Sequence, residues 1–441
     1  MYPDTQGFID LLNTLDEHPF PPARELFARD QELIVTRAPG RLDVMGGIAD
    51  YSGSLVLELP IAEATFAALQ LNAELQLNVV TLLDDEPHHS SFSMSLRELE
   101  PVSYEQARSL FQQDGWAAYV AGVFLVLMRE RGIQFTSGAN ILVSSRVPPG
   151  KGVSSSAALE VAVMEAVTRA FNIEVEPRDV ALLCQRVENM VVGAPCGVMD
   201  QMTAVFGERD RLLALLCQPA EIKNMIALPS PLKLWGIDSG IRHSVGGSDY
   251  GSVRAGAFMG QRILGTGTYL ANIWPVEFEN RYAVQLPDRI SGEEFLARYT
   301  GTMDPVTSID PQREYAVKLP TAHPIYENAR VQRFIDLLQA PEIDFDELGE
   351  LMYASHQSYT ALGLNSHGTD LLVDLVHKED GLFGAKITGG GSGGTVAVLG
   401  NQNSQAAIDR IAKAYANETG HHPYIFNGSS SGSLAFGHLQ L

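Results

Sequence analysis

The stretch Ser145-Arg-Val-Pro-Pro-Gly-Lys-Gly-Val-Ser-Ser-Ser-Ala-Ala-Leu-Glu160 lies between a predicted strand at 139–146 and a predicted helix at 156–171. Its glycines allow the backbone to approach an anion closely, and we expect the serines that open the helix to cap it and to leave its first N–H groups available to a ligand. The stretch therefore predicts a phosphate cradle, and the alternative is an ordinary capped helix after a turn. The predicted nucleotide-binding residues are Pro149, Gly150, Lys151, Gly152, Val153, Ser154, Ser155 and Ser156.

This cradle differs from the Walker loop G-x-x-x-x-G-K-[ST]. In that motif a Ser or Thr follows the lysine, whereas here Gly152 follows Lys151. Ser145 also stands where the first glycine of the motif belongs. The loop therefore indicates phosphate binding of another class.

A second glycine-rich stretch, Lys-Ile-Thr-Gly-Gly-Gly-Ser-Gly-Gly-Thr-Val-Ala-Val-Leu, covers residues 386–399. Residues 389–394 match G-x-G-x-x-G, but a β-branched run follows the glycines where a dinucleotide site needs a helix. The pattern instead predicts two strands around a hairpin tip. Either another segment passes closely over this tip, or the hairpin is a flexible surface loop. Its glycines are Gly389, Gly390, Gly391, Gly393 and Gly394.

A third stretch, 37–61, places polar residues on a glycine-containing loop between predicted strands at 34–37 and 55–62. Arg41, Asp43 and Asp50 interrupt the apolar pattern there. Polar groups on a loop between strands are well placed to bind a hydroxylated ligand.

The length of 441 residues exceeds what one ordinary hydrophobic core supports. We expect an α+β protein with two domains, 1–225 and 226–441, because sheets and helices are segregated along the chain rather than strictly alternating. The boundary is suggested by an interruption of the pattern at 220–230. The other predicted elements are further sheet at 65–82, helices at 105–131 (broken near Gly115), 177–190, 326–339, 345–362, 366–377 and 404–418, and strands at 233–238 and 424–426.

The formal net charge of −22 argues against binding to nucleic acid or to an anionic membrane, because both require a basic surface. An anionic ligand must then be held by backbone N–H groups, a helix N-terminus or a metal ion. We expect neither a signal peptide nor a membrane span. Three cysteines at spacings that fit no zinc template indicate reduced thiols and a cytoplasmic protein, with Cys196 small and buried. Nothing in the sequence indicates the oligomeric state.

Together, the three stretches resemble the motifs of the GHMP kinases, and the galactokinase branch is the most similar. Two further segments, 187–201 and 238–250, extend the resemblance over most of residues 33–400. It implies a two-domain GHMP kinase fold with mixed sheets, helices packed on them and the active site between the domains. It also implies that the substrates are ATP and a sugar, that Mg²⁺ is required, and that phosphoryl transfer is to the anomeric hydroxyl.

The resemblance implies a role for each matching position. Asp200 matches the Asp that faces the anomeric hydroxyl, and Arg242 matches an Arg that keeps this Asp ionised. Glu188 matches the magnesium-binding carboxylate, and Ser156 is the hydroxyl ligand implied, with Ser155 as the alternative. Trp116 either lines the adenine pocket or belongs to the core. The positions that match sugar-site residues are Arg41, Asp50, Gly197 and Tyr250.

One departure from the galactokinase pattern concerns the substrate. Gly47 and Ile48 replace a Glu-His pair that, by resemblance, reaches the exocyclic 6-hydroxyl of galactose, while Asp50 is kept. An apolar surface at this position offers the 6-hydroxyl no hydrogen bond, so binding no longer favours a sugar that carries this group. The pyranose form of L-arabinose is galactose without this CH₂OH group, and the stretch 46–57 resembles plant-type L-arabinokinases. L-Arabinose is therefore the favoured substrate. Galactose, a uronic acid and a catalytically silent sugar- and ATP-binding regulator are the alternatives.

Overall fold

An eight-stranded sheet dominates the N-terminal half of the computed structural model, which describes residues 2–83, 89–111, 115–241 and 248–441. Its strands are β1 (Ile34–Met45), β2 (Leu55–Asn72), β3 (Gln76–Leu83), β4 (Ser90–Ser95), β5 (Gly138–Ser145), β6 (Arg211–Leu216), β7 (Glu221–Ala227) and β14 (Leu439–Gln440). The strand order is β14-β1-β2-β5-β3-β4, and β6 and β7 extend the sheet beside β2. Only β3 and β5 pair in parallel among the described strands, so this sheet is mixed.

A second, four-stranded sheet lies in the C-terminal half. Its strands, in spatial order, are β11 (Leu382–Ile387), β12 (Thr395–Asn401), β8 (Leu232–Asp238) and β13 (Ile425–Asn427), and all of them pair antiparallel. A separate two-stranded ribbon joins β9 (Arg289–Ser291) to β10 (Glu314–Ala316). Leu42 and Val44 of β1 share one apolar cluster with Leu234 and Ala397 of the second sheet. Because both faces of β1 are covered, all twelve of its residues are buried.

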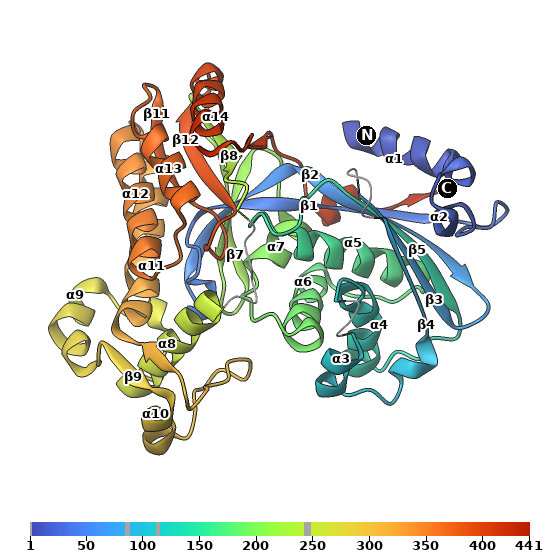
Figure 1. The fold of residues 1–441 in the computed structure, drawn as a ribbon, viewed down its shortest axis with the longest axis horizontal. Helices are drawn as coiled ribbons and strands as arrows, with labels where there is room; N and C mark the ends of the chain where they lie inside the picture. The colour runs from blue at the N-terminus through green and yellow to red at the C-terminus, as the bar shows by residue number, and fades with distance from the viewer. Residues whose placement is uncertain (1, 84–88, 112–114, 242–247) are drawn as a thin grey trace.

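The helices form two groups, one beside each half of the molecule (Figure 1). The group of the N-terminal half is α1 (Pro3–Asn13), α2 (Pro21–Arg24), α3 (Tyr104–Leu110), α4 (Ala117–Arg131), α5 (Ser155–Ala170), α6 (Pro177–Arg186), α7 (Met199–Phe206) and, from the end of the chain, α15 (Ser433–Phe436), which packs on α7 and β1. The group of the C-terminal half is α8 (Ser248–Leu264), α9 (Pro275–Glu277), α10 (Gly292–Tyr299), α11 (Lys318–Leu338), α12 (Phe345–Ala361), α13 (His367–Val376) and α14 (Gln405–Thr419). Helices α4 to α7 build one large core with the N-terminal sheet. Among the described residues, no helix is long and apolar enough to cross a membrane.

Most of the elements expected from periodicity are present, with shifted ends. The predicted break near Gly115 separates α3 from α4, and α5 and α12 begin within one residue of their predicted starts. Helix α11 begins at Lys318, eight residues earlier than predicted, because Pro324 lies inside the helix instead of before it. Residues 220–230, where the domain boundary was expected, include the edge strand β7, and the chain passes from one sheet to the other at 228–231.

The end of the chain returns to the first sheet. After β13, an isolated bridge joins Ser429 to Ile61, and β14 pairs with the start of β1. Figure 1 shows both chain ends on the same side of the N-terminal sheet. A division at 225 therefore falls two residues before the end of β7, and residues 429–441, which such a division assigns to the second domain, contact the first sheet.

A buried ion pair joins the two halves. The Lys386 ammonium on β11 lies 3.0 Å from the Asp43 carboxylate on β1, and neither side chain is exposed to solvent. The same ammonium donates to the Asp43 carbonyl oxygen, and the Asp43 N–H donates to the Thr388 hydroxyl. Because removal of one partner leaves a buried charge unpaired, the two residues depend on each other.

The substitution Lys386→Met tests this joint. It is expected to lower the free energy of unfolding by about 3–5 kcal/mol, because the Asp43 carboxylate would lose its cation in a site without water. Urea denaturation followed by circular dichroism measures the change. Arg410→Met, which removes an exposed ion pair with Glu379, is the matched control and is expected to change stability little. A Lys386→Met variant as stable as this control would contradict the interpretation.

Candidate active site

Four loops and the start of α8 meet in one cleft, whose empty volume is about 640 Å³, part of it open to solvent. The sugar loop (46–54) joins β1 to β2, and the phosphate loop (146–154) joins β5 to α5. The segment 193–198 precedes α7, and the Gly-rich loop (388–394) joins β11 to β12. The described residues that line the cleft are Arg41, Ile48, Asp50, Gly150, Gly152, Ser154, Ser155, Ser156, Glu188, Cys196, Gly197, Met199, Asp200, Tyr250, Gly389 and Gly390.

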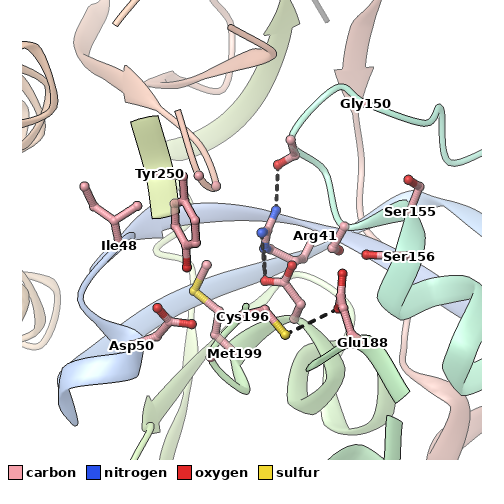
Figure 2. Close-up of a pocket in the computed structure, with 16 residues that line it drawn as sticks. Arg41, Ile48, Asp50, Gly150, Ser155, Ser156, Glu188, Cys196, Met199 and Tyr250 are labelled. Carbon is pink, nitrogen blue, oxygen red and sulfur yellow. Dashed lines mark hydrogen bonds and ion pairs between the residues drawn. The ribbon is translucent and has the colours of Figure 1, made fainter. Parts of the chain in front are cut away.

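This lining brings together most of the residues singled out in the sequence, although they are up to 350 positions apart. Figure 2 shows two ends of the cleft: Ile48, Asp50 and Tyr250 lie on one side of Arg41, and Ser155, Ser156 and Glu188 on the other. Trp116 is partly buried in the N-terminal core, packs edge-on against Phe92 and is not among the lining residues. Arg242 lies outside the described residues. The other expected residues that do not line the cleft are Gly47, Pro149, Lys151, Val153, Gly391, Gly393 and Gly394.

Arg41 holds the centre of the cleft. Its Nη2 lies 2.7 Å from Oδ1 of Asp200, and its Nη1 donates to the Gly152 carbonyl oxygen over 2.7 Å. Its Nε lies 3.2 Å from Oε2 of Glu58. Burial alone would lower the pKa of Arg41, but the carboxylates of Asp200 and Glu58 raise it above its usual value, so the guanidinium stays charged. The described partner of Asp200 is thus Arg41, which the sequence predicted only as a sugar-site residue.

The phosphate loop and the start of α5 form an anion-binding end. Ser154, the residue before α5, has a left-handed backbone, and its buried hydroxyl caps no N–H group. The expected serine cap is therefore wrong, and the first N–H groups of this 16-residue helix lack a side-chain cap on the side of the cleft. Lys151 points elsewhere, because its ammonium lies 2.7 Å from the Asp238 carboxylate of β8. That ion pair ties the loop to the second sheet.

Glu188 lies on a π-helical turn, Val187–Val192, that directly continues α6. Its Oε2 accepts from Nε2 of Gln201 over 2.7 Å, and the Ser156 hydroxyl also hydrogen-bonds to this carboxyl group. Burial, with the neighbouring charge of Asp200, raises the pKa of Glu188 to about 7. Cys196, expected to be buried, is only partly buried and lines the cleft, with Sγ 3.5 Å from Oε2 of Glu188.

The donor set at this end fits a magnesium ion. Mg²⁺ is usually bound through one or two carboxylates together with substrate phosphates, rather than by a cage of protein ligands. Glu188 and Ser156 supply one carboxylate and one hydroxyl beside the phosphate loop. Consistent with so few protein ligands, no group of three or more His, Cys, Asp and Glu side chains that could hold a metal occurs in the described part of the chain.

Asp50 lies at the other end, on a short 3₁₀ turn of the sugar loop, and is 3% exposed. Burial raises the pKa of its carboxyl to about 6; the charge on Asp200 adds to the rise, and Arg254 opposes it. Gly197 is required beside it, because a Cβ atom at this position would lie 1.8 Å from Oδ2 of Asp50. Oδ1 of Asp50 is buried and has no hydrogen-bond partner among the described residues. A carboxylate held this way is suited to accept hydroxyl groups from a ligand.

Gly47 and Ile48 have different surroundings. A Cβ atom at Gly47 would lie 2.0 Å from both Oδ2 of Asp43 and the Tyr359 hydroxyl, so this glycine makes room for the buried joint between the halves. Ile48 lines the cleft, is 1% exposed and has a φ of 52°. A β-branched residue in this left-handed region is strained, and such strain persists only where the surroundings enforce it.

The Gly-rich loop is packed against its neighbours. Gly389 is buried, and a Cβ atom there would lie 2.8 Å from the Gly152 carbonyl oxygen. A Cβ atom at Gly391 or Gly394 would meet the backbone carbonyl oxygen of Leu364 or Lys151, respectively. The phosphate loop therefore passes closely over this tip, as one reading of the sequence predicted, and the alternative of a flexible surface hairpin is wrong.

Several residues of the site were not predicted from the sequence. Met199 lines the cleft directly before Asp200. Glu58, fully buried on β2, lies beside the Arg41 guanidinium, and His323 and Glu327 of α11 contact the sugar loop from the second half. The buried charges are visible in the sequence only as polar residues inside apolar runs, and the partner of each one is set by tertiary structure.

The comparisons with known proteins agree with this geometry. Residues 118–208 match the GHMP kinases N terminal domain, 334–420 the GHMP kinases C terminal domain, and 24–71 the galactokinase galactose-binding signature. The chain is 46% identical to L-arabinokinase of Arabidopsis thaliana over 94% of its own length, and 31% identical to galactokinase of Chloroflexus aurantiacus over 88%. It covers 47% of that L-arabinokinase, about half, and 89% of that galactokinase.

A solved structure has the same fold. Lactococcus lactis galactokinase in complex with galactose superimposes with a TM-score of 0.78 at 20% sequence identity, covering 99% of this chain and all of that one. The chain therefore belongs to the GHMP kinase family. Within that family, it groups with the sugar kinases that carry the galactose-binding signature.

Asp200→Asn tests the centre of the site. We expect kcat to fall on the order of 10²-fold or more, because an amide cannot accept the proton of a reacting hydroxyl, while sugar binding is kept. A coupled ADP-release assay measures turnover, and calorimetry measures binding. Asp210→Asn, an exposed change beyond the end of α7, is the matched control. Near-normal kcat in Asp200→Asn would exclude Asp200 as the proton acceptor.

Proposed function

We propose that this chain is an ATP- and Mg²⁺-dependent sugar 1-kinase that converts L-arabinose to L-arabinose 1-phosphate. The observation that carries the substrate assignment is Ile48, which lines the sugar end of the cleft together with Asp50. The reaction class is supported by the family membership and by the Arg41–Asp200 pair between the two ends. Three free thiols, two of them buried, fit a reducing compartment, and we infer a cytoplasmic location.

The geometry supports direct in-line transfer. The anomeric hydroxyl lies at Asp200, which accepts its proton as the oxygen attacks the γ-phosphorus of ATP, and ADP leaves with the electrons of the broken P–O bond. Arg41 pairs with Asp200 and orients its carboxylate through the 2.7 Å contact. The phosphate loop and the start of α5 hold the nucleotide by backbone N–H groups. Positioning and charge neutralisation supply most of the rate in such reactions.

Glu188 and Ser156 would hold the magnesium ion beside the nucleotide phosphates. When bound, the ion neutralises phosphate charge, which matters in a chain of net charge −22. Burial raises the pKa of Glu188, and a bound cation would favour its ionised form.

The residues at the sugar end of the cleft favour a pentopyranose over galactose and over a uronic acid. Ile48 offers neither a donor nor an acceptor to a 6-hydroxyl group, and its side chain occupies space beside the ligand. A uronic acid would need a cation near C6, but Arg41 is the only basic residue among the described residues that line the cleft, and it is engaged by Asp200 and Gly152. The similarity to L-arabinokinase supports the same choice.

A substrate panel tests the proposed function. We expect kcat/KM for L-arabinose to exceed that for D-galactose by about 10- to 200-fold, the range that one misplaced carbon produces in an apolar pocket. Coupled ADP release with L-arabinose, D-galactose, D-galacturonate and D-glucuronate measures it. Preference for galactose or a uronate would reassign the substrate, and binding without turnover of any sugar would favour a silent regulator.

Ile48→Gly tests the residue that sets the preference. We expect the variant to gain galactose activity relative to L-arabinose by roughly tenfold, because it removes the side chain that fills the cleft and tolerates the left-handed backbone. The ratio of kcat/KM for the two sugars is the measurement. Gly47→Glu is a poor test, since its side chain would enter the Asp43–Tyr359 contact. An unchanged ratio in Ile48→Gly would place the selectivity elsewhere.

Asp50 predicts a pH dependence. Because its pKa is raised to about 6, the carboxylate that accepts sugar hydroxyls is lost as the pH falls below 6, and kcat/KM for the sugar should then drop about tenfold per pH unit. Asp50→Asn should be weakly active without this dependence. A raised carboxyl pKa also destabilises the fold as the pH rises, so Asp50→Asn should unfold at a higher temperature at pH 7. A sugar kcat/KM that is flat from pH 7 to pH 5 would contradict this role.

A further inference from the structure

Helix α11 of the C-terminal half holds both ends of the sugar loop. At the first end, the Gly46 N–H donates to Oε1 of Glu327 over 3.1 Å, and the Gly47 carbonyl oxygen lies 3.0 Å from Nε2 of His323. At the other end, the Leu55 N–H donates to Oδ1 of Asn328 over 2.9 Å. Positions 323 and 327 lie one turn apart on the same face of α11, and 328 directly follows 327, so a single rigid element determines where this loop begins and ends.

The strained residue follows directly after these contacts. Gly46 has a φ of 107°, which glycine tolerates, but Ile48 has a φ of 52°, which a β-branched residue avoids. This conformation directs the Ile48 side chain into the cleft, where Figure 2 shows it facing the same space as Asp50 and Tyr250. A relaxed backbone at Ile48 would direct the side chain elsewhere. Something must therefore hold the peptide between Gly47 and Ile48, and the contact to its carbonyl oxygen comes from His323.

His323 and Glu327 are themselves held in place by α12. Nδ1 of His323 lies 2.7 Å from the Ser358 hydroxyl, and the Ser355 hydroxyl donates to Oε1 of Glu327 over 2.7 Å. Because the Gly47 carbonyl oxygen can only accept, Nε2 of His323 carries the hydrogen and Nδ1 accepts from Ser358. Burial lowers the pKa of His323, which keeps this ring neutral.

Oε2 of Glu327, the oxygen that does not accept from Gly46, pairs with an arginine. It lies 3.1 Å from the Arg330 guanidinium, one turn along α11, and Glu327 is fully buried. Burial alone would raise the pKa of Glu327, but the charges of Arg330 and Lys386 and the hydrogen bond from Ser355 hold it below its usual value, so Glu327 is ionised. An ionised acceptor forms a stronger hydrogen bond to Gly46 than a neutral one. The sugar loop is therefore fixed by a charged and a neutral partner from one helix.

We propose that His323 and Glu327 are positioning residues for sugar selectivity, acting by holding Ile48 in the left-handed conformation that closes the cleft to a hexose. The inference rests on the proposed function, since it concerns the same sugar site. It adds that discrimination at the missing CH₂OH group is enforced from the C-terminal half, through the backbone of a loop that belongs to the N-terminal half.

The test compares two substitutions at one position. His323→Leu removes the donor to the Gly47 carbonyl oxygen, whereas the amide nitrogen of His323→Gln can replace Nε2. We expect His323→Leu to lower the ratio of kcat/KM for L-arabinose to that for D-galactose by about tenfold, the effect of one lost buried hydrogen bond, and His323→Gln to restore most of it. Ser358→Ala removes only the hydroxyl that hydrogen-bonds to Nδ1 and orients the His323 ring. It should shift the ratio in the same direction by about threefold.

The Ile48→Gly background separates positioning from general damage. Glycine adopts the left-handed backbone without strain and has no side chain to direct, so in this background His323→Leu should shift the ratio by less than about twofold. Arg333→Gln, which removes an exposed pair between α11 and Glu347 of α12, is the control for helix packing and should leave the ratio unchanged.

The outcomes separate the two claims. A wild-type enzyme that prefers galactose would refute both the pentose assignment and the closing role of Ile48, whereas a wild-type preference for L-arabinose supports the proposed function alone. The positioning role then fails if His323→Leu and Ser358→Ala lower activity toward both sugars equally, or if the ratio shifts as strongly in the Ile48→Gly background. The positioning role is established if the ratio shifts in His323→Leu, is restored in His323→Gln and no longer shifts when His323→Leu is made in the Ile48→Gly background.

Discussion

The Arg41 guanidinium is the interaction on which the rest of the cleft depends. It contacts the Asp200 carboxylate, the Gly152 carbonyl oxygen and the Glu58 carboxylate at the same time. One side chain from β1 thus connects the start of α7, where Asp200 lies, to the phosphate loop. Because Arg41 is buried, a shift of either carboxylate would leave charge unpaired, so this contact fixes the distance between the start of α7 and the phosphate loop.

The cleft concentrates acidic groups in a chain that is already strongly acidic. Burial raises the pKa of Asp50, Glu188 and Glu160, and each of these groups also lies near another carboxyl group. The arrangement costs stability, as functional sites often do. In the proposed function, the carboxylates bind sugar hydroxyl groups and a cation, and backbone N–H groups at the start of α5 bind the nucleotide phosphates.

The motifs could be predicted from the sequence because each depends on local chemistry. Glycines, serines and isolated carboxylates identify the loops from their local sequence alone. In the structure, residues of these loops line one cleft. The partners could not be predicted in this way. Arg41 is the described partner of Asp200, Lys151 pairs with Asp238, and Gly47 makes room for Tyr359. Each of these depends on contacts between segments more than 80 residues apart, which periodicity and spacing do not encode.

The return of the chain end to β1 has a consequence for biosynthesis. During translation, β1 is made about 400 residues before β14, so its outer edge at Ile34 and Val35 is paired only when residues 439–440 have been made. Until then the nascent chain presents unpaired backbone groups there, the kind of edge at which strands from other molecules add. Completion of the first sheet therefore requires the whole of the second half to be synthesised first.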